Sequence, residues 1–192
     1  MSFSSRWTMA LLTACMATSA MALSAQEEKS LKDQIQQEYK AAKDGCKSLS
    51  GNAKDVCEKE AEGREKVAKA ELALRKEDSP KHRMELAKAR ADAEYEVAKE
   101  KCDDLKGNAE DVCEKDAKAA HVRALEAAKV ADAKNQPARN VEKKAANVSE
   151  ARKDASSNVR KAEYEAAKER CDALSGNAKD ACVNDAKRQF AQ

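Results

Sequence analysis

The residues of this chain best suited to chemistry are cysteines, and they recur in pairs. The two cysteines of each pair lie eleven positions apart, and the pattern occurs three times. Paired thiols at a repeated spacing serve one of three chemistries, namely disulfide bonding, metal binding as thiolates or redox exchange. The pairs are Cys46 and Cys57, Cys102 and Cys113, and Cys171 and Cys182.

The spacing favours disulfide bonds over the other two chemistries. Zinc sites built on cysteine use C-x2-C pairs, often with histidines completing the ligand set. The two histidines of the chain, His82 and His121, lie outside the cysteine pairs and at no common position relative to them. Redox-active cysteines normally lie closer together, as C-x-x-C. An even number of cysteines at repeated spacing in an exported chain is instead typical of a disulfide framework.

The first 25 residues have the composition of an export signal. Arg6 is their only charge, and an apolar run over residues 7–22 follows it. Small residues then give two A-x-A-like ends, at Ala22 and at Ala25, which is the pattern of a secretory signal peptide. The apolar run is short for a membrane span. We therefore expect residues 1–25 to be a cleaved leader.

Cys15, the seventh cysteine, lies inside this leader. The residues Leu12-Thr13-Ala14-Cys15 resemble a lipoprotein cleavage box. Such a box usually ends the hydrophobic segment, whereas apolar residues continue here past Cys15. We expect soluble export; the alternative is a lipoprotein held on a membrane through Cys15.

Each cysteine pair lies within a copy of one longer passage. The copies share Tyr, Ala, Cys and Leu at spacings of three, four and three, which places these residues on one face of a helix. A Gly-Asn dipeptide follows; glycine is preferred just past a helix C-terminus, and asparagine is a strong N-cap. One helix should therefore end and another begin with almost no loop. The copies begin at Tyr39, Tyr95 and Tyr164, and the dipeptides are Gly51-Asn52, Gly107-Asn108 and Gly176-Asn177.

The chain reversal and the cysteine pairing imply each other. In a continuous helix, residues eleven positions apart are separated by roughly 16 Å, whereas a disulfide needs Cα atoms within about 7 Å. We therefore expect each pair to close a disulfide across a helical hairpin. The alternative is an uninterrupted helix with both cysteines on one face, cross-linked to another chain.

Composition indicates long helices in shallow contact. Charged residues make up 38% of the chain and aromatic residues 3%, against roughly 25% charged in average domains. Alanine, lysine, glutamate and arginine, all strong helix formers, dominate. Pro80 and Pro137 mark reversals between hairpins, because proline is disfavoured beyond the first helical turn. The expected fold is all-α, with three disulfide-clamped hairpins of long, thin, antiparallel, coiled-coil-like helices.

We predict six helices and three hairpin repeats after the leader. The repeats span 26–79, 80–136 and 137–192, and the third has a longer first helix in which residues 156–158 are a candidate break. The tyrosine of each repeat is predicted to pack beside the disulfide. The predicted helices span 28–50, 52–78, 80–106, 108–134, 138–175 and 177–190.

The chain shows no constellation typical of an enzyme. It has no Ser/His/Asp set, no glycine-rich phosphate loop and no evident pair of catalytic carboxylates. Its net charge is +2 with both signs interspersed, so the basic stripe of a nucleic-acid-binding protein is missing. We therefore expect a non-enzymatic structural or interaction protein, with protein partners and no cofactor.

The alternative is a periplasmic stress protein that binds a metal or a small ligand. Its candidate ligands are acids near the second Gly-Asn dipeptide, Asp103, Asp104 and Asp111, together with His82 or His121. Carboxylate and imidazole groups are ordinary ligands for divalent metals.

The motif Y-x-x-A-K-x-x-C-x-x-L-x-G-N-A-x-D-x-C, placed after a leader and within Ala/Lys/Glu-rich sequence, resembles a group of uncharacterised exported proteins of Gram-negative bacteria. Some of these are described as TolA-like cell-envelope proteins. The resemblance covers nearly all of the chain after the leader and implies a periplasmic or envelope location. The chain lacks the N-terminal anchor and mixed C-terminal domain of TolA itself, so the resemblance implies no role in the Tol–Pal system and no active-site residue.

Overall fold

A computed structural model describes residues 23–191, and the predicted leader up to residue 22 lies outside the described residues. The described part is all-α. Its helices are α1 (Ala25–Cys46), α2 (Asn52–Lys76), α3 (Pro80–Cys102), α4 (Asn108–Asn135), α5 (Val141–Arg170) and α6 (Gly176–Phe190), with a short 3₁₀ turn, η1 (Cys171–Ala173), after α5.

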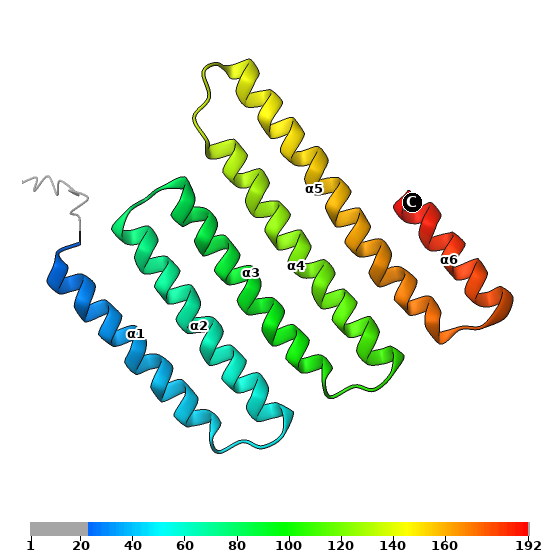
Figure 1. The fold of residues 1–192 in the computed structure, drawn as a ribbon, viewed down its shortest axis with the longest axis horizontal. Coiled ribbons are helices and arrows are strands. Elements are labelled where there is room, and N and C mark those ends of the chain that lie inside the picture. Colours follow the sequence, from blue (N-terminus) through cyan, green and yellow to red (C-terminus); the bar gives the residue numbers. More distant parts are fainter. Residues whose placement is uncertain (1–22, 192) are drawn as a thin grey trace, which may run out of the picture.

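The six helices lie side by side in a single layer (Figure 1). They follow the order of the chain, and neighbours run in opposite directions. Each helix packs mainly on the helices that precede and follow it in the sequence. The molecule is therefore an array of three hairpins, α1–α2, α3–α4 and α5–α6, with two broad faces, and its stability is expected to be a sum of local terms.

The core is a thin seam of small side chains between neighbouring helices. An added Cβ at Gly63 would lie 2.8 Å from Cβ of Ala93, so α2 and α3 approach more closely there than two alanines would permit. Alanine and cysteine dominate the buried apolar residues, which are Cys46, Ala61, Leu72, Leu86, Ala91, Cys102, Ala117, Ala119, Ala155, Ala166, Cys171 and Ala186.

One charged side chain is buried among the described residues. Glu126 of α4 is 5% exposed and accepts hydrogen bonds from Lys129 (2.8 Å) and from Asn158 of α5 (2.9 Å). Burial alone would raise the pKa of this carboxyl group, but the two hydrogen bonds outweigh it and hold the pKa below its ordinary value. The sequence left open whether the fifth helix breaks at 156–158; α5 is continuous there, and Asn158 bonds to Glu126 of α4.

The predicted first helix of each hairpin is too long at its C-terminus. α1, α3 and α5 end at Cys46, Cys102 and Arg170, and the chain then tightens into bonds from the leucine N–H to the cysteine carbonyl three residues earlier (2.8–3.0 Å). The leucines assigned to the helical seam therefore lie in the turns and are partly exposed. They are Leu49 (43%), Leu105 (38%) and Leu174 (44%).

The Gly-Asn dipeptide marks each reversal as predicted, but its residues have different roles. Gly51 and Gly107 are the N-caps of α2 and α4, not the residues that end the preceding helices, and they have φ of 58° and 59°. Asn52 and Asn108 are the first helical residues instead of N-caps. In the third hairpin Ser175 is the N-cap, and glycine, with φ of 54°, begins α6.

Between hairpins the reversals lie at the two prolines, as predicted. Pro80 is the first residue of α3, and Ser79 caps that helix by accepting a hydrogen bond from His82 N–H at 3.2 Å. Pro137 lies between the end of α4 and Asn140, whose side chain accepts from Lys143 N–H at 2.8 Å.

Gly45 and Gly51 allow the cost of a positive φ to be measured without a steric clash. Neither Gly45 nor Gly51 has an atom within 4 Å of an added Cβ, but Gly51 alone has a positive φ. We expect Gly51→Ala to lower the free energy of unfolding by about 1–2 kcal/mol, because the left-handed conformation is costly for alanine. Gly45→Ala, inside α1, should raise it by about 0.5–1 kcal/mol. Urea denaturation of both variants checks this, and equal effects would contradict it.

Candidate functional site

The three predicted disulfides are present, one at the tip of each hairpin. Cα atoms are 5.6 Å apart in Cys46–Cys57, 5.6 Å in Cys102–Cys113 and 5.7 Å in Cys171–Cys182. These distances suit a disulfide and require the chain to reverse between the cysteines. The alternative of a continuous helix linked to another chain is therefore wrong.

The disulfides join the tip of one helix to the start of the next, and one sulfur of each is shielded. Cys46, Cys102 and Cys171, at the ends of the first helices, are 0% exposed, whereas their partners are half-buried. Thiol exchange requires access to a sulfur. Attack on one sulfur is enough, so the burial shields one side of each bond, while the case for a structural clamp rests on the eleven-residue spacing and the fixed reversal.

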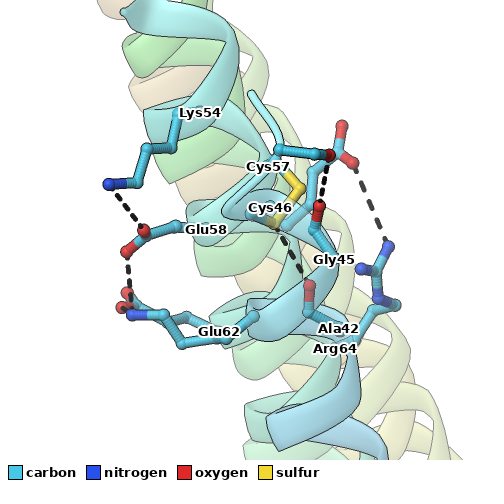
Figure 2. The surroundings of a disulfide bond; sticks show 11 residues. Ala42, Gly45, Cys46, Lys54, Cys57, Glu58, Glu62 and Arg64 are labelled. Carbon is cyan, nitrogen blue, oxygen red and sulfur yellow. Dashed lines mark hydrogen bonds and ion pairs between the residues drawn. A yellow bond between two sulfur atoms is a disulfide. The ribbon is translucent and has the colours of Figure 1, made fainter. Parts of the chain in front are cut away.

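Lysine–carboxylate pairs accompany the first clamp (Figure 2). Lys43 Nζ of α1 lies 2.8 Å from a carboxylate oxygen of Glu58 and 3.6 Å from one of Glu62, both in α2. The same contact raises the pKa of Lys43 and lowers the pKa of Glu58, mainly through their hydrogen bond. Both groups are solvated, so the pair adds little to the disulfide.

The acids and histidines of the metal-binding alternative do not converge. Asp103, Asp104 and Asp111 lie at the tip of the second hairpin, and His121 is ten residues further along α4, about 15 Å away along the helix axis. His82 lies at the opposite end of α3, beside the Glu77 carbonyl oxygen (2.8 Å from Nδ1). Over residues 23–191, no three His, Cys, Asp or Glu side chains are grouped to hold a metal ion.

His121 packs inside the second hairpin, an arrangement that sequence reasoning missed. Its Nε2 lies 2.7 Å from Asp92 Oδ1, and its ring stacks on Tyr95 with centroids 4.7 Å apart. The prediction that Tyr95 packs beside the disulfide did not include this ring contact, nor the approach of Lys118 Nζ to 5.4 Å from the centre of the same ring. The only signal in the sequence was an aromatic residue on the apolar face of one helix and an imidazole on the next. The pair fastens α3 to α4.

Polar contacts also join one hairpin to the next, and they repeat. At the first junction Lys101 Nζ of α3 lies 3.8 Å from Glu60 Oε1 of α2. At the second, Arg170 of α5 pairs with Asp116 of α4, and these two residues occupy the same repeat positions as Lys101 and Glu60. A basic residue at the end of one hairpin's first helix thus meets an acid of the preceding hairpin.

The asparagine of the Gly-Asn dipeptide belongs to this junction. Asn108 Nδ2 donates a hydrogen bond of 3.0 Å to the carbonyl oxygen of Glu169, which lies 61 residues away in α5. Asn52 occupies the same repeat position at the first junction, but both polar atoms of its side chain are buried there without a hydrogen-bond partner. Asn177, at the same repeat position of the third hairpin, is exposed, and no described helix follows α6.

A groove lies over the first junction. It has a volume near 610 Å³, and residues such as Val67 of α2 and Val97 of α3 line it. The pair Arg90–Glu71 (2.7 Å) spans its two sides near one end, and the Lys101–Glu60 pair lies near the other. We call the face of the layer that carries this groove the groove face.

Arginines gather on the groove face. Arg64 and Arg90 line the groove itself, and Arg75 lines the neighbouring groove between α1 and α2. Across the second junction Arg123 pairs with Glu163 at 2.8 Å, and Glu163 repeats the position of Glu94 in the groove. The acids Glu60, Glu71 and Glu94 line the same groove, so this face carries both signs of charge beside its apolar side chains.

Comparison with known proteins gave no further assignment. No protein-family model matches the chain, and neither does a curated protein or a solved structure. Within the part of the chain that the structure describes, no helix is long and apolar enough to cross a membrane. The three disulfides indicate an oxidising compartment.

Removing one clamp should destabilise the layer without unfolding its helices. We expect Cys102→Ser with Cys113→Ser to lower the free energy of unfolding by about 3 kcal/mol, the chain-entropy value for a loop of this length. The far-ultraviolet helical signal should largely persist, because the alanine-rich propensity remains. Denaturation followed by circular dichroism measures both, and non-reducing peptide mapping checks the pairing. A Cys46–Cys102 link in the unmodified protein, or disulfide-bonded dimers as its main species, would contradict the pairing within each hairpin.

The junction asparagines provide a second test with a matched control. Asn108→Ala removes the hydrogen bond to Glu169 and should lower the free energy of unfolding by about 1 kcal/mol. Asn177→Ala makes the same change at the same repeat position where no described hairpin follows, and it should alter stability by less than about 0.5 kcal/mol. Equal losses would show that the asparagine acts within its own hairpin.

Proposed function

We propose that this protein is a non-enzymatic structural or interaction protein of the bacterial periplasm or cell envelope. The observation that carries the proposal is the single layer of clamped hairpins. Every described helix between α1 and α6 packs on two neighbours, and no other described helix covers either broad face. Repeat arrays of this kind use extended surfaces to bind other proteins.

The groove face is the surface we assign to a protein partner. It combines small apolar side chains with guanidinium groups, which bind carboxylates in a planar, bidentate manner. Two of these arginines, Arg90 and Arg123, already pair with acids of the neighbouring helix. They therefore hold their positions before a partner arrives, which lowers the entropy lost on binding.

The periplasmic location rests on the leader and the disulfides together. The resemblance to exported Ala/Lys-rich proteins of Gram-negative bacteria supports the same location. We propose that the leader is cleaved after Ala22 instead of Ala25, because cleavage there keeps the cap of α1. Ser24 Oγ accepts from Glu27 N–H at 3.2 Å, and the Glu27 carboxylate accepts from Ser24 N–H at 2.9 Å.

Intact-mass measurement of the exported protein tests the leader. We expect a chain that begins at Leu23, with six cysteines oxidised. A chain that begins at Gln26 would contradict the argument from the cap, and a diacylglyceryl group on Cys15 would overturn soluble export.

Histidine substitution tests the absence of enzymatic or metal chemistry. We expect His82→Ala and His121→Ala to leave any property lost on deletion of the gene unchanged, after correction for the stability lost with the His121–Asp92 contact. The double variant Cys102→Ser with Cys113→Ser is the control, because it disturbs the layer while keeping both histidines. Loss of the property in a stable histidine variant, or tight stoichiometric binding of a divalent metal in calorimetry, would overturn the proposal.

A further inference from the structure

The outer side of α6 repeats the surface by which α2 and α4 bind the next hairpin. α2 contacts the next hairpin through Glu60 and Gly63, and α4 does so through Asn108 and Asp116. Asn52 and Ala119 hold the remaining equivalent repeat positions. The corresponding residues of α6 are Asn177, Asp185 and Arg188. The asparagine and the acid are thus present, and the third residue is different.

Arg188 stands where the two inner junctions require a small residue. At the first junction even a Cβ on Gly63 would come within 2.8 Å of the neighbouring helix, and Ala119 at the second is 3% exposed. An arginine at this position leaves no room for a helix at the same distance. Arg188 also pairs with Asp185, the acid whose counterparts bind the basic residue of the next hairpin.

The outer side of α1 differs at the complementary positions. α3 and α5 present an alanine, Ala93 or Ala162, and a basic residue, Lys101 or Arg170, to the hairpin before them. The equivalent residues of α1 are Gln37 and Gly45, and both are exposed. α1 therefore has neither the alanine nor the basic residue that α3 and α5 carry at these positions.

We propose that the outer side of α6 is a blocked docking surface for the first hairpin of a second copy of this chain. Arg188 on one side and Gln37 with Gly45 on the other keep the three described hairpins from stacking on those of another copy. Because each junction runs head to tail, an unblocked chain would add further copies without closing. The occupant is a second copy because α1 has the same repeat sequence as the helices that already fill this position inside the molecule.

Sedimentation velocity of the purified, oxidised protein tests the proposal. We expect the wild type, the single variant Arg188→Ala and the double variant with Gln37→Ala and Gly45→Lys to remain monomeric. The triple variant that combines these changes should associate with concentration, its weight-average mass reaching at least that of a dimer. Folding should be preserved, because Arg188 and Asp185 have side chains 73% and 68% exposed and Gly45 has open space around its Cβ position.

Charge reversal identifies the interface. Adding Asp185→Lys to the triple variant should return it to a monomer, and using Gly45→Glu in place of Gly45→Lys in that background should then restore association. A triple variant that stays monomeric overturns the proposal, as does association that Asp185→Lys leaves unchanged. Wild-type association that Asp185→Lys abolishes would also overturn it, since the surface would then be open.

Discussion

The short loop closed by each disulfide is the constraint on which the rest of the structure depends. Helices that pack through alanine bury little apolar surface, and burial is the main source of stability in ordinary domains. A hairpin of this composition is therefore weakly held by packing alone. Each bond, such as Cys46–Cys57, fixes the reversal and restricts the unfolded chain.

With the hairpins fixed, small residues and specific polar contacts join them into a layer. Gly63 allows close approach at the first junction. The Asn108–Glu169 hydrogen bond and the buried Glu126–Asn158 pair set the position of α5 at the second. Such contacts contribute only modest net stability, but they specify alignment because a shifted helix would leave buried polar groups unpaired.

The cysteines and histidines of the described residues have structural positions in this fold. Among the described residues, the candidate chemical groups are either consumed in disulfides or placed too far apart to act together, as His82 and His121 are. The groove face instead offers arginines already held in place by neighbouring acids. The proposed recognition of a protein partner rests on this arrangement.

The sequence by itself determined the repeat, the helical class, the reversals and the cysteine pairing, because these depend on spacing within a few helical turns. It misplaced the ends of the first helices, since Leu105 lies in a turn, and it left the continuity of α5 open, which the structure shows to be unbroken. Only the tertiary structure decided that the hairpins form one layer, that Asn108 reaches the next hairpin, and that Arg188 occupies a junction position. Those features depend on how faces of separate hairpins meet, which local propensity and periodicity do not encode.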